Sequence, residues 1–108
     1  MPSRPRLLAL DMDGTLLNSQ KRISPRTITA LHGLAHRGVV VTLSTGRGLA
    51  EIADFRDELS WLRYSSLDDG ALAYDLEAKR PIDVLPIPDT LVLSCIGIGR
   101  REGVMVHM

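Results

Sequence analysis

Apolar and polar residues occur in blocks along this chain, and the first blocks predict a strand, a helix and a second strand. Residues 7–10 are four apolar residues without polar alternation, which is typical of a central strand buried on both faces. Residues 25–37 place apolar side chains on one helical face, with Ser24 as the amino-terminal cap and Gly38 as the stop. Residues 39–44 are β-branched and apolar, and predict a second buried strand. Such a unit almost always closes right-handed with its two strands parallel.

The following blocks predict shorter elements. A helix is expected from residue 49 to about residue 59, and a third strand within residues 61–67. Residues 71–75 and 82–87 flank a polar connection and are expected to pair as a hairpin. In the helix expected from residue 49, a core stripe of side chains should face the interior: Leu49, Ile52, Ala53 and Leu59.

The composition changes near two prolines, Pro86 and Pro88, which mark a boundary. Beyond them, an apolar segment from Leu91 is expected to be helical despite two glycines, with Asp89 or Thr90 as its cap. Residues 104–108 resemble the start of a further strand.

Composition narrows the class of protein. The 108 residues suit one domain, 44% hydrophobic content suits a packed core, and 13 basic residues balance 13 acidic ones. The sequence has no basic stripe that would predict a nucleic-acid partner, and none of its apolar runs reaches the length of a membrane span. The single Cys95 rules out an internal disulfide, so we expect a cytoplasmic protein in which this thiol packs in the core.

Two carboxylates, Asp11 and Asp13, follow the first predicted strand, where open α/β sheets place their ligands. A cation is the expected partner of two adjacent anions at the end of an apolar run. The alternative is a simple turn, since Asp-Gly pairs are common turn formers, and the spacing alone leaves both open. An EF-hand loop is excluded, because Gly14 comes too early and Leu16 stands where that loop needs its glycine.

A second polar group, Thr45, Gly46 and Arg47, follows the second predicted strand and is expected at the same sheet edge as Asp11. The guanidinium of Arg47 offers a planar fork of donors that matches phosphate oxygens. Ser44 is the fallback hydroxyl, although it still belongs to the strand. Taken alone, this loop is weak evidence, since it could simply be a strand-to-helix connection.

The run Asp11-Met12-Asp13-Gly14-Thr15-Leu16 resembles the first motif, D-x-D-G-T-L, of the haloacid dehalogenase (HAD) superfamily. The resemblance implies that Asp11 attacks phosphorus and that Asp13 protonates the leaving oxygen and then activates water. It implies a Mg²⁺ cofactor beside these carboxylates. Gly14 lets the backbone approach the phosphate closely.

Further stretches resemble the Cof-like sugar-phosphatase branch of that superfamily. Ser44-Thr45-Gly46-Arg47 is similar to its second motif, which implies that the Thr45 hydroxyl binds the transferring phosphoryl group. Residues 18–23 would form the flap after the nucleophile, with Lys21 and Arg22 expected to be ordinary exposed charges. Asp69 stands where the branch usually has asparagine, and a carboxylate repels phosphate unless a cation is close, so we expect a turn at residues 68–70 rather than a substrate contact.

The resemblance implies an α/β fold with a Rossmann-like parallel sheet. Residues 1–75 would be the amino-terminal part of the HAD core, and residues 76–108 the truncated start of an inserted α+β cap domain. The implied activity is magnesium-dependent hydrolysis of small phosphorylated metabolites, such as sugar phosphates, through an aspartyl-phosphate.

The family's later lysine and its Gly-Asp-x-x-x-Asp motif have no counterpart here, so we expect the chain alone to bind Mg²⁺ weakly and to have little phosphatase activity. A different class of function stays open: a catalytically silent fragment or interaction module that keeps half of the HAD fold. Three core strands also leave a sheet edge uncovered, through which the chain could self-associate.

Overall fold

The computed structural model describes residues 3–107, which contain one five-stranded sheet in the order β1-β2-β3-β4-β5. Its parallel part comprises β1 (Leu7–Leu10), β2 (Val40–Ser44) and β3 (Tyr64–Leu67). Its antiparallel part comprises β4 (Leu72–Asp75) and β5 (Arg80–Val84). The helices are α1 (Pro25–His36), α2 (Leu49–Ile52) and α3 (Asp89–Glu102). The predicted α/β fold with a Rossmann-like parallel sheet is confirmed, and an antiparallel pair extends that sheet.

The first strand-helix-strand unit forms by the predicted local chemistry. The Thr27 amide donates to the Ser24 hydroxyl at 3.2 Å, and Pro25 occupies the first turn of α1. The helix ends at His36, and Gly38 takes a φ of +84°, which favours glycine. The returning strand β2 then pairs in parallel with β1.

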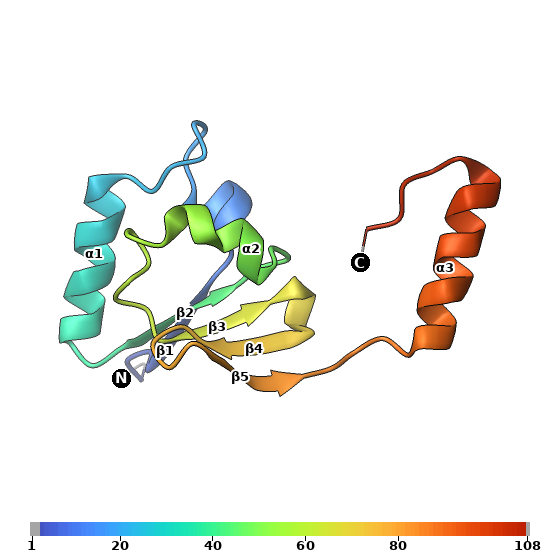
Figure 1. Ribbon diagram of the computed structural model, residues 1–108. Helices are drawn as coiled ribbons and strands as arrows, with labels where there is room; N and C mark the ends of the chain where they lie inside the picture. Colours follow the sequence, from blue (N-terminus) through green and yellow to red (C-terminus); the bar gives the residue numbers. More distant parts are fainter. Residues whose placement is uncertain (1–2, 108) are drawn as a thin grey trace.

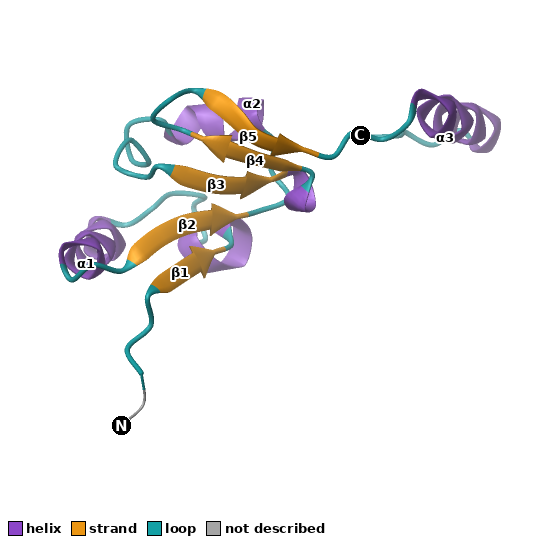
Figure 2. Ribbon diagram, turned by 90° about the horizontal axis from the view of Figure 1, so that it is seen from below, coloured by secondary structure: helices purple, strands orange, loops and turns teal. Residues whose placement is uncertain are grey.

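Helices α1 and α2 cover one face of the sheet and leave the opposite face open (Figures 1 and 2). Alternation along β2 buries Val41 and Leu43 under the helices. On the open face, Leu7 is 59% exposed and Val40 46% exposed. The prediction that residues 7–10 are buried on both faces is wrong, because β1 is an edge strand and, within residues 3–107, no helix covers its second face.

The second predicted helix is shorter than expected. α2 ends at Ile52 and tightens into the 3₁₀ turn η2 (Ala53–Phe55). In a 3₁₀ turn, residues three apart point the same way, so Ile52 and Phe55 both reach the core. Leu59 is buried as predicted, whereas Leu49, 39% exposed, and Ala53, also exposed, do not belong to the core stripe.

The predicted hairpin is confirmed as β4 and β5, although β5 begins two residues before the predicted arm and ends at Val84, and β4 also pairs with β3. The third strand is shorter than residues 61–67, because the Trp61 indole donates to the Glu58 carbonyl at 2.9 Å within a turn. Since β5 belongs to the sheet, the hydrogen-bonded core continues to Val84, past the boundary expected after residue 75. The division into two domains stays a prediction.

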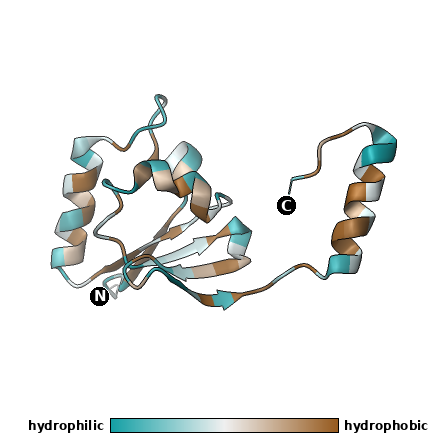
Figure 3. Cartoon of the chain, viewed as in Figure 1, coloured by the Kyte–Doolittle hydropathy of each residue, from teal (hydrophilic) through white to brown (hydrophobic). Residues whose placement is uncertain are grey.

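Helix α3 forms where the sequence predicts it and stands away from the sheet at the end of an extended segment (Figure 1). The predicted cap is wrong, because Pro88 stands at the cap position and, within residues 3–107, no side chain caps the first turn. Cys95 is exposed on α3, so its expected place in the core is wrong. Residues 104–107 are not a strand: the Val104 amide donates back to the Gly99 carbonyl at 3.0 Å, and this segment folds against the helix. Met108 lies outside the described residues. Figure 3 shows that α3 carries apolar residues although it lies away from the core.

Among the described residues, no helix has the length and apolar character that crossing a membrane requires.

Candidate active site

A wide turn after β1 positions the first carboxylate of the site. Asp11 follows Leu10 directly, and its Oδ1 accepts a hydrogen bond from the Met12 amide at 2.8 Å. The Leu16 amide closes the turn on the Asp11 carbonyl at 3.1 Å, and the Met12 side chain is fully buried beneath it. Gly14 takes a φ of +76° in this turn, which a side chain would strain. The apolar anchors of the turn therefore hold Asp11 at the sheet edge.

Thr45 comes to the same edge from β2, because Leu10 lies opposite Leu43 in the parallel pair. Its amide donates to the Ser66 carbonyl at 3.0 Å, and the residue is 5% exposed. The Thr45 hydroxyl accepts a hydrogen bond from the Arg47 amide at 3.1 Å. A hydroxyl that accepts through its oxygen keeps its own proton to donate, so Thr45 can donate to an anion beside it.

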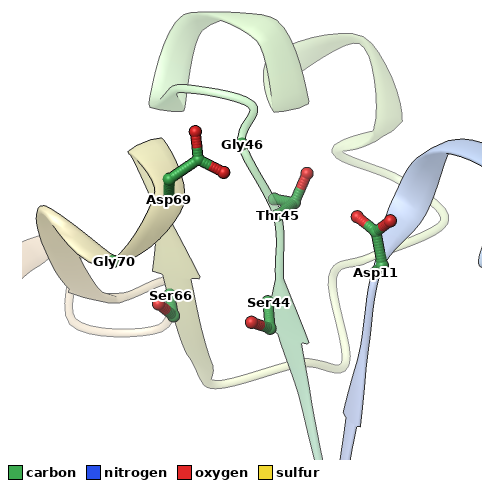
Figure 4. Close-up of a pocket in the computed structure, with 7 residues that line it drawn as sticks. All are labelled: Asp11, Ser44, Thr45, Gly46, Ser66, Asp69 and Gly70. Atoms are coloured by element: carbon green, nitrogen blue, oxygen red, sulfur yellow. The ribbon is translucent and has the colours of Figure 1, made fainter.

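These residues open onto a polar pocket of about 340 Å³ at the carboxyl ends of β1, β2 and β3. Figure 4 shows the Thr45 hydroxyl between the carboxylates of Asp11 and Asp69. The seven lining residues are Asp11, Ser44, Thr45, Gly46, Ser66, Asp69 and Gly70.

Asp13 is held by two cations rather than by the pocket. Its Oδ2 accepts from Arg47 Nε at 2.8 Å, and its Oδ1 accepts from Arg47 Nη2 at 3.0 Å and from Lys21 Nζ at 3.1 Å. These hydrogen bonds, that of Arg47 first, hold the pKa of Asp13 well below its usual range. Asp13 is therefore firmly ionised in this arrangement.

Local structure explains why both cations reach Asp13. The Arg47 guanidinium lies 5.5 Å above the Phe55 ring, which limits its directions. Lys21 has a φ of +58° in a tight turn closed by Asn18, whose side chain accepts the Gln20 amide at 3.0 Å. Lys21 is exposed as expected, with 65% of its side chain accessible, but it is not a free charge, because this turn aims it at Asp13.

Comparison with known proteins identifies the arrangement. A family model described as haloacid dehalogenase-like hydrolase matches residues 8–108. The chain belongs to the haloacid dehalogenase-like hydrolase family. This family likeness extends through the site loops and into α3.

Relatives in the haloacid dehalogenase-like family are similar over most of this chain. The HMP-PP phosphatase of Yersinia pestis is 36% identical over 103 residues, which is 95% of this chain and 37% of that protein. The HMP-PP phosphatase of Serratia proteamaculans is 39% identical over 70 residues, which is 65% of this chain and 26% of that protein. A haloacid dehalogenase-like hydrolase from B. subtilis superposes with a TM-score of 0.82 at 28% identity, covering 91% of this chain and 34% of that one. The chain thus spans about a third of the length of the relatives it matches.

The sequence-predicted site residues fall into two groups. Asp11, Thr45 and Gly46 meet in the pocket, whereas Asp13 and Arg47 form an ion pair beside it. Gly14 is exposed in the turn between the two groups and does not line the pocket. The catalytic, substrate-binding and metal-binding roles of all six residues stay predictions.

Three pocket residues were not predicted as site residues: Ser66, Asp69 and Gly70. Ser66 comes from the end of β3, and the rule that gathers polar residues at strand ends would have found it. Asp69 and Gly70 form the expected turn and also face the pocket, which their turn-forming residue types could not indicate.

The residues present fit a magnesium ion in part. Mg²⁺ is commonly held by one or two carboxylates together with waters and substrate phosphate oxygens. Asp11 uses one oxygen to accept the Met12 amide and has its other oxygen available toward the pocket. Both oxygens of Asp13 are engaged by cations, so Asp13 could serve as a ligand only after they release it. Among residues 3–107, no group of three acidic, histidine or cysteine side chains gathers as a ready metal site.

Proposed function

We propose that this chain carries the amino-terminal half of the active site of a magnesium-dependent phosphohydrolase that acts on small phosphorylated metabolites, such as sugar phosphates. The observation that carries the proposal is the meeting of the Asp11 carboxylate and the Thr45 hydroxyl in one polar pocket. A nucleophile and a hydrogen-bond donor are thereby held on rigid strand ends, as a reaction governed by positioning requires. The HMP-PP phosphatases among its relatives support this class of substrate. The single cysteine supports the cytoplasm as the compartment.

In the proposed reaction, Asp11 is the nucleophile. One carboxylate oxygen forms a bond to phosphorus while the bond from phosphorus to the leaving oxygen breaks, which leaves an aspartyl-phosphate on Asp11. Water then attacks phosphorus and releases inorganic phosphate and the free carboxylate. The Thr45 hydroxyl donates to a phosphoryl oxygen in both steps.

Asp13 is proposed to supply and accept the protons. An ionised Asp13 is already in the correct form to take a proton from the attacking water. To protonate the leaving oxygen it must first carry a proton, which Arg47 and Lys21 oppose while they are paired with it. A substrate phosphate competes for the same two cations, so its binding would weaken their hold on Asp13.

The remaining roles concern charge. Mg²⁺ bound beside Asp11 would offset the repulsion between this carboxylate and the phosphate. Gly46 lets the backbone of the second loop approach a phosphate in the pocket, and Gly14, outside the pocket, supplies the positive φ of the turn that holds Asp11 there. Arg47 supplies a forked donor at the edge of the site.

Replacing the proposed nucleophile tests the function. Asp11→Asn should abolish any turnover of an aryl phosphate and the binding of beryllofluoride, a phosphoryl mimic, followed by fluorine NMR with Mg²⁺ present. Asp13→Asn should keep beryllofluoride binding and slow the release of phosphate, because it removes the proton carrier and leaves Asp11 in place. Asp57→Asn, at an exposed position outside the pocket, is the matched control. Unchanged turnover by Asp11→Asn would remove Asp11 from the mechanism.

A second candidate function is a catalytically silent interaction module. The observation that favours it is that, within residues 3–107, β1 has an open face and an unpaired edge, with Leu7 59% exposed. Binding of beryllofluoride by the unaltered chain would argue against this candidate, because a silent module has no need of a reactive Asp11.

A further inference from the structure

The turn after β3 is fixed onto the loop after β2 by its backbone. The Asp68 amide donates to the Arg47 carbonyl at 3.1 Å, and the Asp69 amide donates to the Thr45 carbonyl at 3.2 Å. Three consecutive residues of this turn have positive φ values, 50° at Asp68, 54° at Asp69 and 98° at Gly70. The two loops therefore form one unit, and the turn does not orient its side chains independently.

Two glycines in the second loop make room for the two acids of the turn. A Cβ atom on Gly46 would lie 2.9 Å from Oδ1 of Asp69, and one on Gly48 would lie 2.9 Å from Oδ1 of Asp68. Only the first of these carboxylates faces the pocket: Asp69 lines it and Asp68 does not. Figure 4 shows the Asp69 carboxylate across Thr45 from Asp11. Asp69 is thus built into the wall opposite the proposed nucleophile.

The carboxylate of Asp69 has no hydrogen-bond or ion-pair partner among residues 3–107. The two cations of the site loops, Arg47 and Lys21, are paired with Asp13. An ionised carboxylate only accepts hydrogen bonds, so it repels phosphate oxygens and attracts donors. A phosphate held by Thr45 would therefore place the rest of its molecule, not its own oxygens, against Asp69.

We propose that Asp69 is a specificity-determining residue that selects phosphate monoesters whose leaving group carries a hydrogen-bond donor, an ammonium group above all. A second anion on the leaving group is disfavoured, because it would meet an uncompensated carboxylate. This inference rests on the proposed function, since it assumes that the phosphate binds at Thr45 and Asp11.

Three phosphate esters with the same two-carbon frame test the proposal: aminoethyl phosphate, hydroxyethyl phosphate and phosphoglycolate. Their dissociation constants are measured on the 108-residue chain by amide NMR titration, with inorganic phosphate as the reference. We expect aminoethyl phosphate to bind tighter than phosphoglycolate by on the order of fivefold, the effect of an exposed ion pair. In Asp69→Asn this preference should disappear, because an amide has no charge and both donates and accepts.

Asp68→Asn is the matched control, since it removes the same charge from the same turn at a position outside the pocket. It should keep the preference of the unaltered chain, and asparagine tolerates the positive φ at either position. Equal binding of the three esters to the unaltered chain, or an equal loss of preference in both variants, would overturn the role of Asp69. Absence of binding by every ester and by inorganic phosphate would overturn the proposed function and this inference with it.

Discussion

A buried carboxylate, Asp75, fixes the turn between β4 and β5. The residue is 5% exposed, and its Oδ1 accepts hydrogen bonds from the amides of Glu77 at 3.0 Å and Ala78 at 2.8 Å. Its Oδ2 accepts from Arg63 Nε at 3.3 Å. Hydrogen bonds from the Ala78 amide, the Arg63 guanidinium and the Glu77 amide lower the pKa of Asp75 below its ordinary value.

This lowered pKa predicts a stability that depends on pH. Because Asp75 binds its proton less readily in the folded chain than in the unfolded one, its contribution is present above the unfolded pKa of about 3.9 and is lost as pH falls through the folded pKa. Asp75→Asn should therefore unfold at lower urea concentration at neutral pH, and the gap should narrow below about pH 4. The fluorescence of Trp61, the only tryptophan, follows the transition. Unfolding curves of the two proteins that stay equally far apart at every pH would contradict this role of Asp75.

At the same scale, the sequence predicted the positions of individual site residues better than the side chains with which they pair. Asp11 and Thr45 could be placed at one sheet edge because strand ends depend on patterns of apolar residues that the sequence displays. The pairing of Asp13 with Arg47, 34 positions apart, depends on side-chain directions that no local pattern specifies. The turn that aims Lys21 at Asp13 was likewise invisible, since its positive φ falls on a residue type that rarely adopts it.

At the scale of elements, α1 was the most predictable part of the chain, because its cap, its apolar face and its stop are all local. Two glycines, one inside this helix and one after it, allow the helical preference and the left-handed stop to be tested separately. Gly33 has ordinary helical backbone and Gly38 a φ of +84°, and a Cβ would meet open space at both positions.

Alanine at these two glycines should change stability in opposite directions. Gly33→Ala should stabilise the chain by about 0.5–1 kcal/mol, because glycine inside a helix is conformationally costly. Gly38→Ala should destabilise it by about 1–2 kcal/mol, because alanine resists the left-handed region. Urea unfolding followed by Trp61 measures both, since this ring lies 4.8 Å from that of His32 on α1. Two shifts of the same sign would show that α1 is governed by its packing instead.

Elements that depend on distant contacts were less predictable. The predicted helix after β2 is longer than the observed one, because the sequence keeps a helical pattern beyond Ile52. Burial of Phe55 beneath Arg47 favours the tighter 3₁₀ turn instead. The open face of β1 could not be inferred from four apolar residues, since a strand's neighbours are set by the topology of the sheet.

At the scale of the whole molecule, the chain is elongated. Its radius of gyration is 16.9 Å, against about 13 Å for a compact chain of this length. The sheet also ends in β1, which has β2 on one side and, among the described residues, no strand on the other. Unpaired edge groups of this kind can pair with another chain.

We therefore expect concentration-dependent self-association through β1. Leu7→Lys should reduce it, because a charge on an exposed edge strand opposes pairing with a second copy. Leu85→Lys, which replaces a leucine that is 68% exposed outside the sheet, is the matched control. Light scattering across a concentration series measures the mass. A monomer at all concentrations, or an equal effect of the two lysines, would exclude association through this edge.

The separation of α3 from the sheet has a consequence for cooperativity. Every member of the buried core lies between Met12 and Leu67, so the 14 residues of α3 take no part in it. An isolated helix of this length is marginal in water, and Gly97 and Gly99 weaken it further. Amide hydrogens of α3 should then exchange with solvent through opening events that leave β2 intact, while those of Val41 and Leu43 wait for global unfolding. The molecule would behave as two foldons of unequal stability, joined by a segment that transmits little between them.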